Sequence, residues 1–221
     1  MFSEIKKKCT SVKEEYDKFG EKHPVIREWV ETFVFVIIMV ILIRYFLCEI
    51  RWIPSGSMRP TLIEGDRIVV ERVSHFFSKP KRGDVLVFYP PFVKPNRSLI
   101  GILARRTGIG CKDVAFIKRV VGMPGDKLEI KRLSDGKYVV LINDEPLKED
   151  YILSEYDSIP CSPTMHCGPM IVPEGKYFMM GDNRGNSEDS RFWGFLAEGR
   201  IVGRACCVFW PLNRIKTLGN K

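Results

Sequence analysis

A serine between small and rigid residues is the first candidate for chemistry in this sequence. Ser57 lies in PSGSMRP at residues 54–60, where two prolines restrict the backbone on either side. Such a turn can present one hydroxyl as a nucleophile and leave backbone N–H groups free to bind an oxyanion. Ser-Gly-Ser is also common in ordinary loops, so the segment indicates a nucleophile only if a base accompanies it.

The three histidines are weak candidates for that base. His23 precedes a long apolar run, His75 lies among polar and aromatic residues, and His166 lies in a proline-rich segment. None has a convincing acidic partner nearby in the sequence to orient its ring. A Ser-His-Asp triad is therefore disfavoured, and surface positions are the simpler interpretation.

Lys118 could replace histidine as the base if it loses its positive charge. It lies in VAFIKRVV, an apolar segment that predicts a strand. Alternation puts Lys118 on one face with Phe116, and Arg119 on the other. Burial of the first face would lower the Lys118 pKa from about 10.4 toward neutrality. The alternative is that Lys118 faces solvent, with Ile117 and Arg119 on the opposite, buried face, which is less favourable because a guanidinium keeps its proton.

A third polar cluster is GDNRGNSEDSR at residues 181–191. It lies between the apolar runs 177–180 and 192–195, so we expect its polar groups to be partly buried and to bond one another. A solvated loop is the simpler alternative.

Seven cysteines leave the redox state open. Cys161 and Cys167 could form a disulfide across a short loop, or remain two reduced thiols. A zinc site with His166 is disfavoured because no second ligand pair follows at metal spacing.

The N-terminal part predicts a membrane anchor. Residues 33–43 are eleven uninterrupted apolar residues, and extension to residues 29–48 approaches the roughly 20 that a span needs. No small-residue cleavage site follows, which disfavours a removable signal. Residues 1–28 are charged and mixed in sign, and the lysines at 6–8 favour a cytoplasmic N-terminus.

The remaining chain has the length and composition of one folded domain. The protein has 221 residues and a net charge of +8, of which +1 falls on residues 1–48 and +7 on the rest. The sequence has no arginine-rich run, zinc-finger spacing or aromatic RNA-binding signature, so nucleic acid is disfavoured as a partner.

Short β-branched and aromatic runs dominate beyond residue 48 and predict a mainly β fold. We expect an antiparallel β-sheet domain over residues 49–221, with a smaller β-rich insertion at about 127–175, on one N-terminal transmembrane helix. An Asp-Gly turn at 135–136 is typical of a hairpin. The segments 90–110 and 148–173 are expected to be loops. The expected strands span residues 66–73, 84–89, 114–121, 127–132, 137–142, 176–180 and 201–210.

Taken together, these clusters resemble the bacterial type I signal peptidases. SGSMRPTL at 55–62 is similar to the nucleophile motif of that family, FIKRVVGMPGD at 116–126 to its lysine motif and GDNRGNSEDSR to its third motif. RGDVLVF at 82–88 matches an intervening strand. The resemblance covers nearly all of residues 49–211 and the preceding anchor.

The resemblance implies a role for each site residue. Ser57 would be the nucleophile and Lys118 its general base, Ser55 would bind the oxyanion, and Ser187 would hydrogen-bond the lysine amine. Two ion pairs would shape the site, Asp189 with Arg191 and Asp182 with Arg119. The apolar substrate pockets would be lined by Ile53, Met58, Leu62, Phe116 and Ile117.

The resemblance also implies a reaction and a location. Preproteins emerging from the secretion machinery would be cleaved after small residues at positions −1 and −3, with no cofactor or metal. The protein would cross the bacterial cytoplasmic membrane once, beside lipid, with its catalytic domain outside the cytoplasm. The role of the basic segment 92–110 is left open. A membrane-tethered β module without catalytic activity is the alternative.

Overall fold

The computed structural model describes residues 10–11, 15–93, 98, 101, 114–134, 138–152, 161 and 165–218, with only the backbone at residues 44–45 and 75–76. The chain divides into two compact units, Met1–Arg44 and Tyr45–Lys221. Most of the basic segment 92–110 and the Asp-Gly turn at 135–136 lie outside the described residues.

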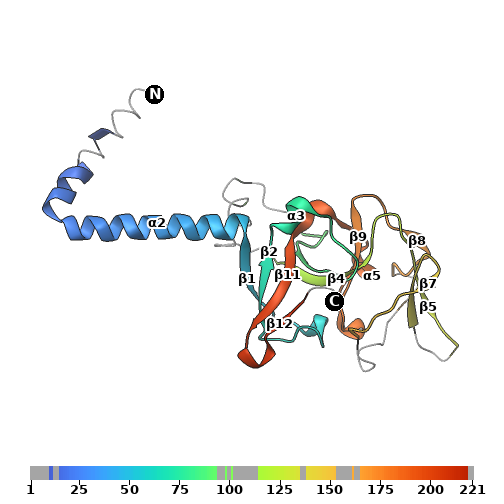
Figure 1. The fold of residues 1–221 in the computed structure, drawn as a ribbon. Coiled ribbons are helices and arrows are strands. Elements are labelled where there is room, and N and C mark those ends of the chain that lie inside the picture. Colours follow the sequence, from blue (N-terminus) through green and yellow to red (C-terminus); the bar gives the residue numbers. More distant parts are fainter. Residues whose placement is uncertain are drawn as a thin grey trace. The chain divides into compact units, whose positions relative to one another are not determined.

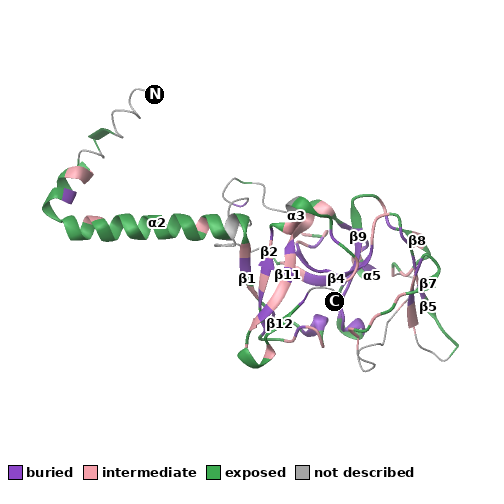
Figure 2. Cartoon of the chain, viewed as in Figure 1, coloured by how far each residue is buried: buried purple, intermediate pink, exposed green. Residues whose placement is uncertain are grey.

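The long helix α2 spans Pro24–Phe46. Proline suits its first position because its missing N–H would have no partner within the helix. Its described side chains are almost all exposed, including the apolar ones (Figure 2). No helix in the described part of the chain is long and apolar enough to cross a membrane. The helix also ends before Cys48, the expected end of the anchor, because Cys48 pairs with Glu71 in a sheet.

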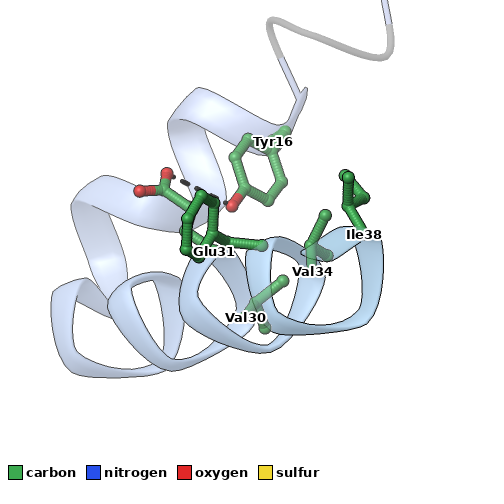
Figure 3. A pocket seen from close by; sticks show the side chains of 6 residues that line it. Tyr16, Val30, Glu31, Val34 and Ile38 are labelled. Atoms are coloured by element: carbon green, nitrogen blue, oxygen red, sulfur yellow. Dashed lines mark hydrogen bonds between the residues drawn. The ribbon is translucent and has the colours of Figure 1, made fainter. Parts of the chain in front are cut away.

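The N-terminal unit has a hollow of its own, of about 420 Å³. Figure 3 shows that Tyr16, from the helical residues 15–22, lies over one side of α2. Its hydroxyl donates to Glu31 Oε1 at 3.4 Å, and the apolar side chains of Val30, Val34, Phe35 and Ile38 complete the lining.

The larger of two sheets has eight strands, all paired antiparallel, in the order β1-β2-β11-β3-β4-β9-β10, with β12 beside β11. Its neighbouring strands β1, β2 and β11 are labelled in Figure 1. Every strand expected in this region forms, within a few residues of its predicted ends. The strands are β1 (Cys48–Trp52), β2 (Arg67–Glu71), β3 (Val85–Phe88), β4 (Phe116–Gly122), β9 (Lys176–Met180), β10 (Leu196–Ala197), β11 (Ile201–Trp210) and β12 (Lys216–Thr217).

A second sheet, of four antiparallel strands, is built between residues 127 and 171 in the order β7-β6-β5-β8. One of its strands, β8, lies in a segment expected to be a loop. The mainly antiparallel β fold is thus confirmed. The strands are β5 (Lys127–Arg132), β6 (Tyr138–Ile142), β7 (Glu145–Pro146) and β8 (Met170–Ile171).

Short helical turns join these strands, and three of them, η1, η3 and α5, carry residues of the polar clusters found in the sequence. They are η1 (Gly56–Met58), α3 (Ser74–Phe77), η3 (Arg184–Asn186), α5 (Ser190–Trp193), η4 (Glu198–Arg200) and η5 (Leu212–Arg214).

Strand β4 is an interior strand of the larger sheet. It pairs with β3 on one side and β9 on the other, and every residue from Ile117 to Gly122 is buried. Its side chains enter three apolar clusters, one with Ile117, one with Val120 and one with Val121. A strand buried on both faces fixes its side chains firmly, which suits it to hold a reactive group.

Candidate active site

The turn η1 presents Ser57 at the edge of the core. Ser57 is only 8% exposed, and its carbonyl accepts a hydrogen bond from the Asn183 backbone N–H at 3.1 Å. The Asn183 side-chain amide donates to the Gly56 carbonyl, also at 3.1 Å. The polar cluster at 181–191 therefore clamps this turn in place. Gly181 is required here because a Cβ atom would clash with the Ser57 carbonyl and the Ser187 hydroxyl.

Lys118 reaches this turn from the middle of β4. Its Nζ lies 2.7 Å from Ser57 Oγ, within hydrogen-bond distance, and also donates to the Ile117 carbonyl at 3.1 Å. The side chain is 4% exposed. The pairing of β4 with β3 and β9 fixes the position of the lysine, and the clamp from Asn183 fixes the serine. Together they bring into contact two side chains that are 61 residues apart in the sequence.

Burial lowers the pKa of Lys118 from 10.5 to about 8. The charges of Asp189, Asp182 and Glu188 oppose this effect, and that of Arg191 adds to it. The amine is therefore neutral in a substantial fraction of molecules near pH 8 and can accept a proton from a hydroxyl.

Two buried ion pairs surround the lysine. Arg119 forms two hydrogen bonds with Asp182, at 2.8 and 2.6 Å, and a third with the Gly83 carbonyl. Arg191 and Asp189 are fully buried and are joined by bonds of 2.8 and 2.9 Å. The structure thus brings together both pairs that the resemblance implies. It also buries Lys118 and Arg119 at once, which the sequence analysis treated as alternatives, because Asp182 compensates the guanidinium.

A cleft of about 370 Å³ opens beside Ser57 and Lys118. One wall is the segment leading into β4, and another is the polar cluster after β9. The lining residues are Pro54, Ser55, Gly56, Ser57, Val114, Ala115, Phe116, Ile117, Lys118, Asn186 and Glu188. The site therefore combines a hydroxyl, a desolvated amine and an apolar wall open to a ligand.

Comparison with known proteins shows the family to which this chain belongs. The family model described as signal peptidase, peptidase S26, matches residues 26–210. The chain belongs to this signal peptidase family. A signal peptidase I of Leptolyngbya laminosa is 40% identical over 88% of this chain and 84% of its own length. Signal peptidase I T of Bacillus subtilis is 34% identical over 86% and 88%. A crystal structure of a signal peptidase I from Enterococcus faecalis covers 57% of this chain and 97% of its own, with 26% identity and a TM-score of 0.38.

Family membership makes this signal peptidase a serine endopeptidase. Its relatives support the removal of signal peptides as the activity. The assignment of individual residues to steps of that reaction rests on the geometry above.

Three of the residues expected to line substrate pockets are part of the core instead. Ile53, Met58 and Leu62 are at most 2% exposed and pack together under η1. Their apolar side chains stabilise the turn that carries Ser57. Burying these side chains in the core is more favourable than leaving them exposed to water in a cleft. Phe116 and Ile117 do line the cleft, and their contact with a substrate stays a prediction.

Of the two further serines expected at the site, Ser55 lies beside Ser57, whereas Ser187 does not contact Lys118. Ser55 Oγ lies 3.5 Å from Ser57 Oγ at the cleft. The expected hydrogen bond between Ser187 and Lys118 is not formed, and the amine contacts Ser57 and Ile117 instead. Ser187 packs on Gly181, and its buried Oγ has no hydrogen-bond partner among the described residues.

Some features of this candidate site were missed in the sequence. Asn183 was not singled out within its cluster, although an amide can both donate and accept and so suits a clamp between segments. Val114, Ala115 and Asn186 were also not assigned to the cleft. Their position depends on how two distant segments pack, which no local pattern reveals.

Cys161 and Cys167 form a disulfide, which answers whether these two cysteines are bridged or reduced. Both sulfur atoms are thereby unavailable as thiolate ligands, which removes the zinc alternative with His166. Within the described residues, no group of three or more His, Cys, Asp or Glu side chains is placed to hold a metal.

The buried lysine predicts a pH-dependent change in stability. The folded-state pKa of about 8 lies below the unfolded value of 10.5, so between these pH values the unfolded chain binds more protons and stability rises with pH. Lys118→Met is therefore expected to stabilise the folded state at pH 7, by up to about 3 kcal/mol, with the gain shrinking toward pH 10. Urea unfolding of both proteins at pH 7 and 9.5 measures this difference.

The matched control for this prediction is Lys131→Met, at an exposed position on β5. It should leave the free energy of unfolding nearly unchanged at both pH values. A Lys118→Met protein that is less stable at pH 7 than at pH 9.5, relative to wild type, would contradict burial of a titrating amine.

Proposed function

We propose that this chain removes signal peptides from exported preproteins by serine–lysine catalysis. Ser57 is the nucleophile, and Lys118 in its neutral form is the general base. The single observation that carries this proposal is the 2.7 Å contact between a buried amine and a serine hydroxyl that lines an open cleft. A lysine held this way is desolvated enough to lose its charge and near enough to take the hydroxyl proton.

The reaction begins when the neutral amine of Lys118 removes the proton from Ser57 Oγ. The oxygen attacks the carbonyl carbon of the scissile peptide, and the resulting oxyanion accepts hydrogen bonds from the Ser55 hydroxyl and the Ser57 backbone N–H. The Lys118 ammonium returns its proton to the nitrogen of the departing mature protein. This leaves the signal peptide bound to Ser57 as an ester.

The second half of the reaction repeats these transfers with water. Lys118 is neutral again, removes a proton from a water molecule and directs the hydroxide to the ester carbonyl. Collapse of the intermediate breaks the ester bond, and the proton on Lys118 goes to Ser57 Oγ. The signal peptide leaves with a free carboxylate, and the enzyme is restored.

The substrate segment binds in extended form along the cleft. Ala115, Phe116 and Ile117 offer an apolar wall next to the reacting groups, and backbone groups beside them suit main-chain hydrogen bonds. Small residues at positions −1 and −3 fit such a shallow wall, as the resemblance implies.

The expected anchor, residues 29–48, is shortened in this proposal to its part within α2, which ends at Phe46 because Cys48 belongs to β1. The support is the exposed apolar surface of α2, formed by residues 33–43 and flanked by Trp29. The N-terminal residues 1–28 then lie in the cytoplasm, and the peptidase domain, residues 49–221 with its insertion at about 127–175, lies outside the bacterial cytoplasmic membrane.

A series of preproteins that differ only at position −1 tests the proposed specificity. Cleavage by the full chain in detergent should be efficient with Ala or Gly at −1 and fall at least about 100-fold with Leu or Phe, because a misplaced scissile carbonyl loses its alignment with Ser57. N-terminal sequencing of the product checks the bond that is cut. Equal rates across the series would refute a small-residue pocket at this site.

A further inference from the structure

Glu188 is the feature of the cleft that the proposed reaction does not use. It lines the cleft together with Ser57 and Lys118, and it is exposed. We propose that Glu188 selects substrates by charge, favouring basic and disfavouring acidic residues in the peptide segment that occupies this cleft. The inference rests on the proposed function, because it assigns a specificity determinant to the same site.

Glu188 is exposed, whereas the residues on either side of it in the sequence are buried. Ser187 and Asp189 have extended backbones and are buried, while Glu188 between them faces outward. Asp189 is neutralised by Arg191, and Asp182 by Arg119. Glu188 has neither an ion pair nor a hydrogen bond with any described residue, so its carboxylate is available to a ligand.

The rest of the described lining offers little charge to compete with it. Lys118 is the other ionisable group there, but it is buried and acts in its neutral form. The remaining lining side chains are uncharged. Above pH 8, where the Lys118 amine is mostly neutral, Glu188 is therefore the main charge among the described residues of this cleft.

The expected size of the effect follows from the exposure of the carboxylate. A solvent-exposed pair of opposite charges changes an equilibrium by up to about fivefold, and salt weakens it. Placed beside the scissile bond, the charge acts on substrate binding and on the transition state alike. We therefore expect about a fivefold preference for Lys over Glu at the substrate position nearest Glu188.

Glu188 also acts on the base. Its charge raises the pKa of Lys118, as do those of Asp189 and Asp182, against the larger effect of burial and the smaller one of Arg191. Removal of the Glu188 charge should therefore shift the onset of activity to lower pH. A merely structural role of an exposed side chain would not produce this shift.

The test measures kcat/KM for preproteins that carry either Lys or Glu at one position at a time, from −5 to +3, at low salt. Wild type should prefer Lys by about fivefold at one or two positions. Glu188→Gln should bring this ratio close to one, and Glu188→Lys should reverse it. Glu145→Lys, an exposed substitution on β7 in the other sheet, should keep the wild-type ratio.

Each outcome decides the proposal. The proposal is supported if Glu188→Lys reverses the preference for Lys over Glu and if the activity of Glu188→Gln begins at a lower pH than that of wild type. The same Lys-to-Glu ratio in wild type and both variants at every position overturns it, provided that the variants have wild-type melting temperatures. A failure of the proposed function looks different, because then wild type would not cleave the preprotein or Ser57→Ala would cleave it equally well.

Discussion

Ser57→Ala is expected to lower kcat/KM for a preprotein by at least about 10³-fold and to leave the fold intact. The substitution removes the atom that forms the ester, and binding and oxyanion contacts alone retain only a small part of the catalysis of a serine hydrolase. The side chain is small and lies at the edge of the core, so the melting temperature should change little. Cleavage of a signal-bearing preprotein in detergent, with thermal unfolding measured in parallel, checks both expectations.

The matched control is Ser78→Ala, an exposed serine after α3 whose hydroxyl donates to the Ser74 carbonyl of that helix and to no other described residue. This protein should cleave at the wild-type rate. If Ser57→Ala retains more than about a tenth of the wild-type activity, the nucleophile lies elsewhere and the dyad is wrong.

Lys118→Arg is expected to lose about 10²- to 10⁴-fold in activity, the range that a general base contributes. Arginine keeps a positive charge at this position but cannot accept a proton at any accessible pH. A role as a fixed cation would tolerate this change, whereas a role as a base would not. The steady-state rate of preprotein cleavage distinguishes the two.

Lys118→Met separates charge from size in the same experiment. Methionine has a similar length, fits the buried site without a positive charge and also lacks a basic nitrogen. We expect the two variants to be similarly inactive and both to remain folded. Substantial activity in either variant would mean that another group deprotonates Ser57.

Much of the fold could be predicted because its strands are locally encoded. β3, β4 and β9 are short apolar runs rich in β-branched and aromatic residues. This composition favours a strand and can be read from the local sequence alone. The two-residue strands β7, β8, β10 and β12 could not be found this way. Each exists only because its backbone meets a longer neighbour, which is a tertiary effect.

The site was predictable in its parts but not in its contacts. Lys118 could be placed on a buried strand, yet its approach to Ser57 depends on the turn η1 and on the clamp from Asn183. Ile53 was expected at a pocket because the family resemblance implied it, and an apolar residue near Ser57 suits either a pocket or the core. Packing beneath η1 decides between them, and local sequence does not specify it.

The pH dependence of cleavage by the wild-type protein tests the central claim most directly, since the claim is that Ser57 is activated by a neutral Lys118. The measurement is kcat/KM for one preprotein between pH 6 and 9.5. Because the pKa of Lys118 is lowered to about 8, the rate should rise about tenfold per pH unit at low pH and level off above pH 8. A rate that is flat over this range, or that levels off near pH 6.5 as for a histidine base, would contradict the account.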